Sequence, residues 1–294
     1  MSLHPSLRRL LQTAALAMLI APVHAAGTDL KLTAFNPGND AIFPVSSVLV
    51  SGQHDAILID AQFGKSQAQK VVDIVRASGK KLTTIYISHG DPDFYFGLDT
   101  VLAAFPDARV VASGPTVQHI KETVDGKMAF WGPKLGADAP AKAVIPEVMQ
   151  GNTLMLEGQK LEITGLDGPQ PDRSFVWIPS IKAVAGGVVV FGNLHVWMAD
   201  TQTPKSHQDW LATLSRIDAL KPAIVIPGHY APGAPQNLES VHYTQGYIRA
   251  FDTQAGKAAD SAALIAAMKA QYPQAGGAAS LELSAKVAKG EMKW

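Results

Sequence analysis

The chain has 294 residues, of which 47% are hydrophobic and 17% charged, so it is long enough to bury a core and is not a disordered sequence. Its 25 Lys and Arg residues balance 25 Asp and Glu residues, which gives no electrostatic case for binding nucleic acid or a membrane surface. The absence of cysteine excludes disulfide bonds, thiolate metal ligands and a cysteine nucleophile.

Residues 1–25 have the pattern of a secretory signal peptide. Arg8 and Arg9 precede the apolar run 10–23, and Val23-His24-Ala25 provides a small-residue cleavage site. The apolar run is shorter than the roughly 20 residues that a membrane-spanning helix needs, so we expect cleavage rather than a retained anchor. The sequence therefore predicts a periplasmic or secreted protein with no membrane anchor after cleavage.

The first half of the chain reads as a hairpin followed by a βα unit. Strands are predicted over 30–35, 45–50, 56–59 and 82–87, and a helix is predicted over 66–77. Ser66 is a candidate N-cap for this helix, and Gly79 is its stop. This order of elements indicates the α/β class.

The second half repeats strands followed by helices. We expect helices over 98–104, 116–123, 207–220 and through much of 236–272, and strands over 109–112, 153–157, 160–164, 175–178, 184–191 and 223–226. Residues 125–146 show no clean period, and we interpret them as a covering loop or lid. We expect two sheets face to face with helices outside, in one domain over 26–272, and an Ala/Gly-rich tail over 273–294.

The predicted strand over 82–87 ends at a cluster of polar residues. His89, Asp91 and Asp93 follow it directly, and Phe94 comes next. Metal ligands are commonly placed in this way, because a buried strand fixes the backbone while the loop after it lets short side chains converge.

This stretch resembles the His-x-His-x-Asp-His motif of the metallo-β-lactamase-fold hydrolases. His89 and Asp93 match ligand positions of that motif, Asp91 stands at a ligand position as a substitute, and Phe94 replaces the last histidine. Val225-Ile226-Pro227-Gly228-His229 fits the last family motif, with His229 as a ligand. The resemblance implies the αββα four-layer sandwich of the metallo-β-lactamase type.

The resemblance also shows losses at ligand positions. Pro169 stands where the family has its third histidine, and Gly187 stands where it has the bridging aspartate. The usual dinuclear site should therefore be absent. His89, Asp91, Asp93 and His229 would still supply two imidazoles and two carboxylates, enough for one divalent ion. Zinc is the expected metal, with iron or manganese as alternatives, and a site without metal is the remaining alternative.

Other residues near these motifs are candidates for the site. His195, in the loop after the strand that bears Gly187, could reach a metal or act as a general base, and Asp200 could orient it. Arg173 could clamp a substrate carboxylate, or it could neutralise Asp91 and Asp93 and leave no metal. Four other histidines are interpreted as surface residues: His54, His119, His207 and His242.

These observations predict an exported, metal-dependent hydrolase with a non-standard, mononuclear site, acting on an ester, lactone or amide bond of a small-molecule substrate. In that reading Asp91, His195 and Asp200 are catalytic residues, and Asp91 is also a metal ligand. The alternative is a metal-free or inactive member of the same fold that binds a small molecule.

Overall fold

The computed structural model describes residues 30–38 and 41–294, so the predicted signal peptide over 1–25 lies outside the described residues. One sheet of six strands has the order β1-β2-β3-β4-β5-β6, and a second of five strands has the order β12-β10-β9-β8-β7. A short third sheet pairs β11 with β13. The strands are β1 (Lys31–Phe35), β2 (Ser47–Ser51), β3 (Asp55–Ile59), β4 (Lys81–Ile87), β5 (Arg109–Ala112), β6 (Glu147–Val148), β7 (Thr153–Leu156), β8 (Gln159–Thr164), β9 (Phe175–Ile178), β10 (Ala183–Ala185), β11 (Phe191–Gly192), β12 (Ile224–Val225) and β13 (His229–Tyr230).

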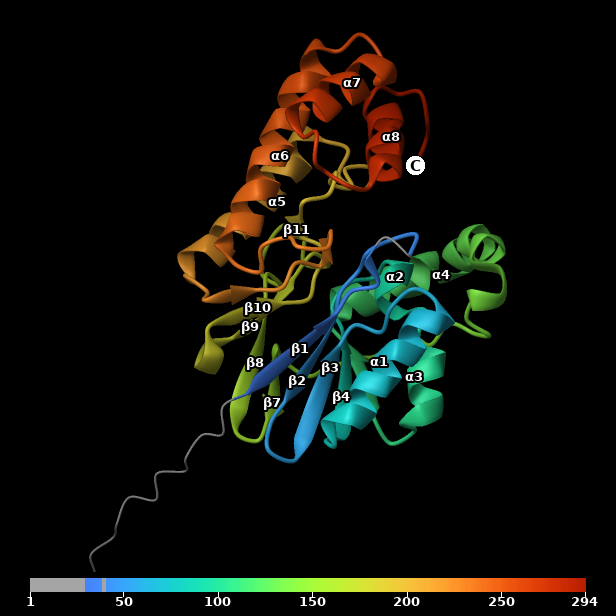
Figure 1. Cartoon of the computed structure of the whole chain (residues 1–294), viewed down its shortest axis with the longest axis vertical. Helices are drawn as coiled ribbons and strands as arrows, with labels where there is room; N and C mark the ends of the chain where they lie inside the picture. The colour runs from blue at the N-terminus through green and yellow to red at the C-terminus, as the bar shows by residue number, and fades with distance from the viewer. Residues whose placement is uncertain (1–29, 39–40) are drawn as a thin grey trace, which may run out of the picture.

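Helices cover the outer faces of both sheets, as Figure 1 shows. The helices α1 and α3 lie outside the first sheet, and α5 and α6 lie over the second. The α-helices are α1 (Lys65–Ser78), α2 (Pro92–Tyr95), α3 (Leu98–Ala104), α4 (Gly114–Leu135), α5 (Pro204–Ala219), α6 (Leu238–Lys257), α7 (Ser261–Gln271) and α8 (Ala278–Ala288). Within the described residues, no helix is long and apolar enough to span a bilayer.

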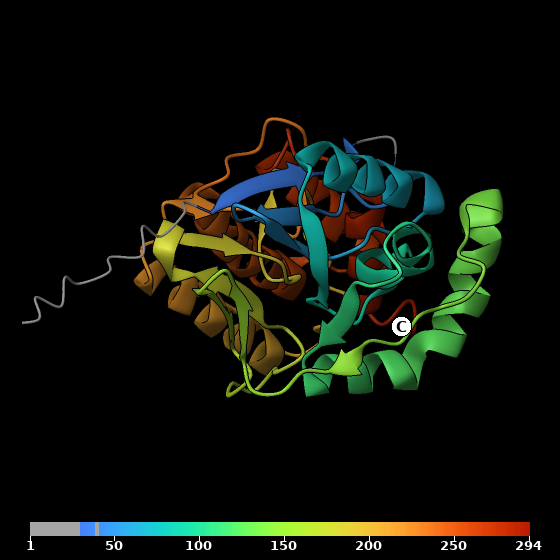
Figure 2. The ribbon, with the colours of Figure 1, turned by 90° about the horizontal axis from the view of Figure 1, so that it is seen from below.

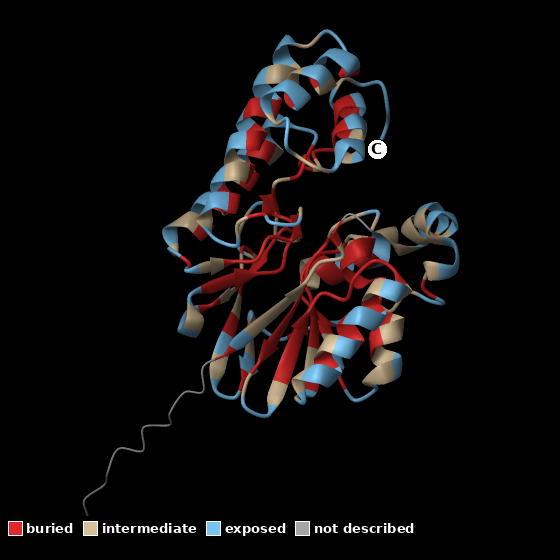
Figure 3. Ribbon diagram, viewed as in Figure 1, coloured by how far each residue is buried: buried red, intermediate tan, exposed pale blue. Residues whose placement is uncertain are grey.

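The burial of strand β2 on both faces shows how the four layers of the fold are arranged. All five of its residues are buried, because both of its faces are covered. Val48 and Val50 belong to a buried cluster that contains Val176 of the second sheet, whereas Leu49 belongs to a cluster that contains Val71 of α1. Alternate residues of a strand point to opposite faces, so one face meets the other sheet and one meets the helices. The expected αββα sandwich is confirmed, and the buried strands stand out in Figure 3.

Helix α4 differs most in length from the elements that we expected. It runs as one helix from Gly114 to Leu135, through a segment that we expected to be a loop, and 3-10 turn residues Gly136–Asp138 follow it. Only its first turns are fully buried, but its apolar residues continue at helical spacing and pack against the core: Val117, Ile120, Val124, Met128, Trp131 and Leu135. Pro133 lies inside the helix, and the sequence pattern of this segment is correspondingly easy to read as a loop. Figure 2 shows α4 along the border of the molecule.

Three smaller differences have local causes. Helix α1 begins after Gly64 rather than Ser66, while Gly79 ends it in the left-handed conformation as expected. The predicted strand over 184–191 is interrupted, because Gly186 and Gly187 have φ of +69° and +81°. Residues 278–288 form helix α8 within the expected tail, with Leu281 fully buried.

Candidate functional site

The site residues lie where β4 and β13 meet the helices of the first sheet. His89 comes two residues after the end of β4, and α2 then begins at Pro92, a residue that tolerates a first helical position because it has no N–H to leave unsatisfied. Asp91 precedes α2 but makes no capping hydrogen bond with it, so its carboxylate is available to other partners. His229 opens β13, which pairs in parallel with β11.

The expected metal ligands form two separate pairs, each of one histidine and one aspartate. His89 Nε2 lies 3.1 Å from Asp91 Oδ2, and His229 Nε2 lies 2.7 Å from Asp93 Oδ2. The ring of Phe94, which is fully buried, contacts both imidazoles edge to face, at centroid distances of 5.3 and 5.4 Å. Phe94, which replaces the last histidine of the motif, therefore lies between the two pairs, and both imidazoles pack against its ring.

The site also contains a cation that the sequence did not indicate. Lys127 of α4 places its Nζ 2.8 Å from Asp91 Oδ1, 3.0 Å from the carbonyl oxygen of Gly90 and 3.0 Å from His119 Nε2. An ammonium can only donate, so His119 accepts at Nε2 and carries its proton on Nδ1, which lies 3.5 Å from Asp172 Oδ2. The interpretation of His119 as a surface residue was wrong. Its partner Lys127 lies in the part of α4 that we had expected to be a loop.

Gly90 is required where His119 approaches the loop. A Cβ at this position would lie 2.8 Å from the His119 ring, closer than real side chains come. The small residue between His89 and Asp91 therefore lets α4 dock its polar face against the ligand loop.

His89, Asp91, His119, Lys127 and Asp172 form a polar cluster, and charge pairing within it shifts the pKa of His89, Asp91 and Asp172. Burial works to raise the pKa of Asp91, but the charges and hydrogen bonds of His89 and Lys127 outweigh it and hold that pKa well below its ordinary value. Burial works to lower the pKa of His89, and Asp91 reverses this to a raised pKa. Burial works to raise the pKa of Asp172, but the hydrogen bond from His119 and the charges of His89 and Arg173 together lower it to about 2.

The second pair lies in aromatic surroundings. The Phe191 ring stacks on His229 at 5.0 Å with an interplanar angle of 12°, and Phe43 meets the imidazole edge on at 6.5 Å. His229 Nδ1 is buried and has no hydrogen-bond partner in the structure. With its Nε2 bound to Asp93, His229 has the arrangement of an imidazole oriented by a carboxylate.

Asp60 supports the ligand loop from behind. At the end of β3 it accepts hydrogen bonds from the Ser88 backbone N–H at 2.7 Å and from the Ser88 hydroxyl at 2.6 Å. Ser88 Oγ in turn accepts from the Gly187 N–H at 2.7 Å. This chain of bonds fixes the residue before His89 and ties it to Gly187, which follows β10 of the second sheet.

The stability of the fold should depend on the pH through Asp60. Burial raises the pKa of Asp60 from its ordinary value of 3.8 to about 7, so the folded chain keeps a proton that the unfolded chain has released. At ~1.4 kcal/mol per pH unit, this proton contributes about 4 kcal/mol to the free energy of unfolding. The contribution is present in full below pH ~4 and is lost as the pH rises to ~7. Urea unfolding of the wild type and of Asp60→Asn across this range should give a flatter slope for the variant, and equal slopes would contradict the assignment.

Gly187 shows why no side chain stands at the bridging position. Its φ is +81°, and a Cβ there would lie 2.1 Å from the carbonyl oxygen of Ser174. The backbone itself occupies the place that an aspartate would need. Pro169, at the other lost position, is exposed.

The expected partnership of His195 with Asp200 is not formed. His195 Nδ1 lies 3.0 Å from the Tyr247 hydroxyl, and burial lowers the pKa of His195 to about 4. Asp200 Oδ1 instead accepts a hydrogen bond from Trp294 Nε1 at 2.6 Å. The two residues face different elements, so Asp200 does not orient His195.

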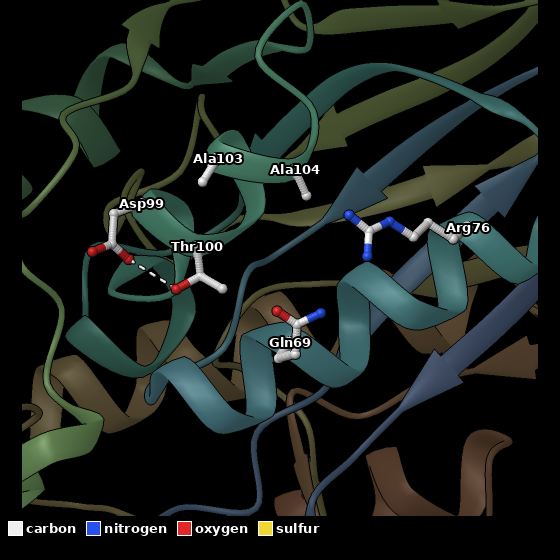
Figure 4. A pocket seen from close by; sticks show the side chains of 6 residues that line it. All are labelled: Gln69, Arg76, Asp99, Thr100, Ala103 and Ala104. Carbon is white, nitrogen blue, oxygen red and sulfur yellow. Dashed lines mark hydrogen bonds between the residues drawn. The ribbon is translucent and has the colours of Figure 1, made fainter.

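The remaining histidines and one surface groove lie outside the site. His54 and His242 are exposed, as expected, but His207 is buried and pairs with Asp252 Oδ1 at 2.6 Å, which joins α5 to α6. A groove of about 390 Å³ between α1 and α3 contains none of the site residues (Figure 4). It is lined by Gln69, Arg76, Asp99, Thr100, Ala103 and Ala104.

The layered fold and the polar residues at the ends of β4 and β13 define an αββα protein of the metallo-β-lactamase type. The family model of the metallo-beta-lactamase superfamily matches residues 41–229, and the chain belongs to that superfamily. Membership supports a hydrolase-like function at the level of the family. Members of the family typically depend on a divalent metal.

Individual relatives are distant. A metallo-beta-lactamase from Pontibacter korlensis is 18% identical with a TM-score of 0.54, over 75% of this chain and 99% of the other. A metallo-beta-lactamase family protein from Thermus thermophilus is 14% identical with a TM-score of 0.61, over 88% of this chain and 91% of the other. These likenesses show the fold alone. The uncharacterized protein YobT of Bacillus subtilis (strain 168) is 36% identical over 73 residues, which are 25% of this chain and 31% of that protein.

The residues of this site do not fit the metal that the family implies. Within residues 30–38 and 41–294, no group of three or more His, Asp or Glu side chains is placed to hold an ion, whereas a protein zinc site takes three or four. The four expected ligands are engaged in two ion pairs, whose imidazoles both pack against the Phe94 ring. The Lys127 ammonium already holds one oxygen of Asp91, and its charge opposes a second cation at that place.

Proposed function

We propose that this chain is a metal-independent member of the metallo-β-lactamase superfamily that binds a small molecule at the polar cluster around His89. One observation carries the proposal: the cation that compensates Asp91 is the ammonium of Lys127, a residue of the chain itself. The four cluster side chains other than His89 are between 18% and 32% exposed, so solvent reaches the polar cluster, whereas the pair of Asp93 and His229 is nearly closed.

The charges of the polar cluster indicate how it would bind a ligand. Asp91 and Asp172 have carboxylate oxygens partly open to solvent, and a ligand can also take over donors that Lys127 and His119 now direct to partners inside the cluster. Such prearranged polar groups lose little freedom when a ligand binds, which favours affinity. A small molecule with both donors and acceptors suits this cluster better than a hydrocarbon or a polyanion.

Hydrolysis is the second candidate, and the pair of Asp93 and His229 favours it. A neutral His229 that donates Nε2–H to Asp93 has a lone pair on Nδ1 for general-base catalysis, which contributes roughly 10²–10⁴-fold to a reaction rate. Water or a substrate would have to reach Nδ1, which is buried between aromatic rings. The bond cleaved would be an ester, lactone or amide, as the family resemblance suggests.

A small-molecule screen in excess EDTA tests both candidates. We expect at least one polar compound to raise the thermal midpoint in EDTA, and Lys127→Met to weaken its binding by tenfold or more, about 1.4 kcal/mol. Lys121→Met, at an exposed position of the same helix, is the control and should bind as the wild type does. Turnover of an ester, lactone or amide in EDTA would favour the second candidate. Binding or turnover that requires added zinc would overturn the metal-independent proposal.

We also predict that the protein is exported. The pattern over residues 1–25 supports cleavage and release to the periplasm or the medium, with no membrane anchor. N-terminal sequencing of protein recovered from cell fractions would locate the cleavage site. Protein in the cytosolic fraction with residues 1–25 intact would contradict the prediction.

A further inference from the structure

Arg173 has two buried donors that no atom of the protein accepts. It lies before β9, is 6% exposed, and its guanidinium carbon lies 4.3 Å from the centre of the Trp210 ring. Its Nε and Nη2 are both inaccessible to solvent and without a hydrogen-bond partner. A buried charged donor without an acceptor is costly, so a native arrangement of this kind needs an explanation.

The two unpaired donors share a geometry. Nε–H and Nη2–H lie on one edge of the planar guanidinium and point the same way, which matches the two oxygens of a carboxylate. Stacking on Trp210 fixes the plane of this edge. The edge is therefore oriented for one planar acceptor group.

No acidic side chain of the chain fills that role. Among the described residues, none forms an ion pair with Arg173, although Asp200, Asp172 and Asp91 are near enough to counter the lowering of its pKa by burial. Each of these carboxylates already has a partner elsewhere: Trp294 for Asp200, His119 for Asp172, and His89 with Lys127 for Asp91. Within residues 30–38 and 41–294, no group accepts from these two donors, so a ligand can supply the acceptor.

Arg173 borders the polar cluster. The carbonyl oxygen of Asp172, the residue before it, lies 3.0 Å from His89 Nδ1, and the Arg173 charge is near enough to oppose protonation of His89. We propose that Arg173 is a specificity residue that binds the carboxylate of a small-molecule ligand through Nε and Nη2, while the polar cluster binds the remainder of that ligand. This inference rests on the proposed small-molecule binding and names the class of ligand as small carboxylates. Because the edge is buried, neighbouring groups have to move when the ligand binds, and association should be slower than diffusion.

Two substitutions at Arg173 separate charge from geometry. Arg173→Lys keeps the charge but loses the two-donor edge, and Arg173→Met keeps an apolar stem against Trp210. Arg216→Lys is the matched control, because Arg216 is exposed and bonds Asp167 in the neighbouring loop. Circular dichroism and thermal unfolding would establish that each variant is folded.

The probes are acetate, lactate, succinate and benzoate, each beside its methyl ester, measured by calorimetry and by tryptophan emission at up to about 10 mM. We expect at least one carboxylate to bind the wild type with tenfold or greater preference over its ester. That binding should weaken at least tenfold in Arg173→Lys, disappear in Arg173→Met and persist in Arg216→Lys. The emission of Trp210 should change on binding, because Arg173 stacks on its ring.

Several results would overturn this inference. They are equal binding of carboxylate and ester, undiminished binding in Arg173→Lys, and no binding of any of the four carboxylates. An experimental structure with an ordered water on Nε and Nη2 that carboxylates do not displace would do the same. A ligand that depends on Lys127 but not on Arg173 would sink this inference alone, whereas a ligand that requires zinc would sink the proposed function.

Discussion

Replacing Gly187 by aspartate, the residue that the family has there, should destabilise the fold rather than supply a metal ligand. The new Cβ would lie 2.1 Å from the carbonyl oxygen of Ser174, and the backbone φ of +81° is itself strained for a side chain. Backbone strain of this kind costs about 1–3 kcal/mol, and the clash adds to it, so we expect a loss of roughly 4 kcal/mol in unfolding free energy. Chemical denaturation measures this loss directly.

Gly158→Asp is the matched control for that result. Gly158 has the same φ of +81°, but a Cβ there meets no atom within 4 Å. Its substitution should cost about 1 kcal/mol, since only the backbone strain applies. If Gly187→Asp is as stable as Gly158→Asp, or if it gains a bound zinc ion, then the placement of residues 174–187 is wrong.

His229→Ala should also lower the free energy of unfolding strongly, because it leaves the carboxylate of Asp93 buried without its partner. Asp93 is 5% exposed and His229 is 7% exposed, with a 2.7 Å bond between them. Removal of one partner of a buried ion pair typically costs about 3–5 kcal/mol. The stacking of Phe191 on the imidazole is lost as well. Urea unfolding should show this cost.

Two further variants separate the ion pair from the rest of the site. The double substitution His229→Ala with Asp93→Ala should be less destabilised than the sum of its two single substitutions, since no charge remains unpaired. His242→Ala, at a histidine 56% exposed beside Asp218, should change the unfolding free energy by less than about 0.5 kcal/mol. Additive losses at His229 and Asp93 would show that the pair is not coupled.

The sequence predicted the first sheet well because its strands are apolar and its turns are clear. The runs over 45–50, 56–59 and 82–87 became β2, β3 and β4, since burial on both faces selects continuous apolar residues. It did not predict the full length of α4, because Gly126, Gly132 and Pro133 interrupt the later turns, although Val124, Met128, Trp131 and Leu135 there pack against the core. Consequently Lys127 and His119 were missed, although His119, Thr123 and Lys127 recur at a spacing of four, which places them on one face of a helix.

The motif indicated part of the candidate site but neither its pairing nor all of its residues. It pointed to His89, Asp91, Asp93 and His229, and the two imidazoles among them pack against Phe94. Their division into two ion pairs depends on the Phe94 ring and on Lys127, which is distant in the sequence. The pairing of His195 with Asp200 failed for a related reason: their sequence separation said nothing about Tyr247 and Trp294, which engage them instead.

Metal analysis of the purified protein tests the central claim most directly. Protein prepared without chelator, supplied with one equivalent of zinc and then dialysed should retain far less than one ion per chain, because Lys127 and the two ion pairs occupy the candidate ligands. Atomic emission spectrometry would measure zinc per chain in the dialysed wild type and in the Lys121→Met and Lys127→Met variants. Retention of one zinc ion per chain by the wild type, lost in His89→Ala or His229→Ala, would contradict the account.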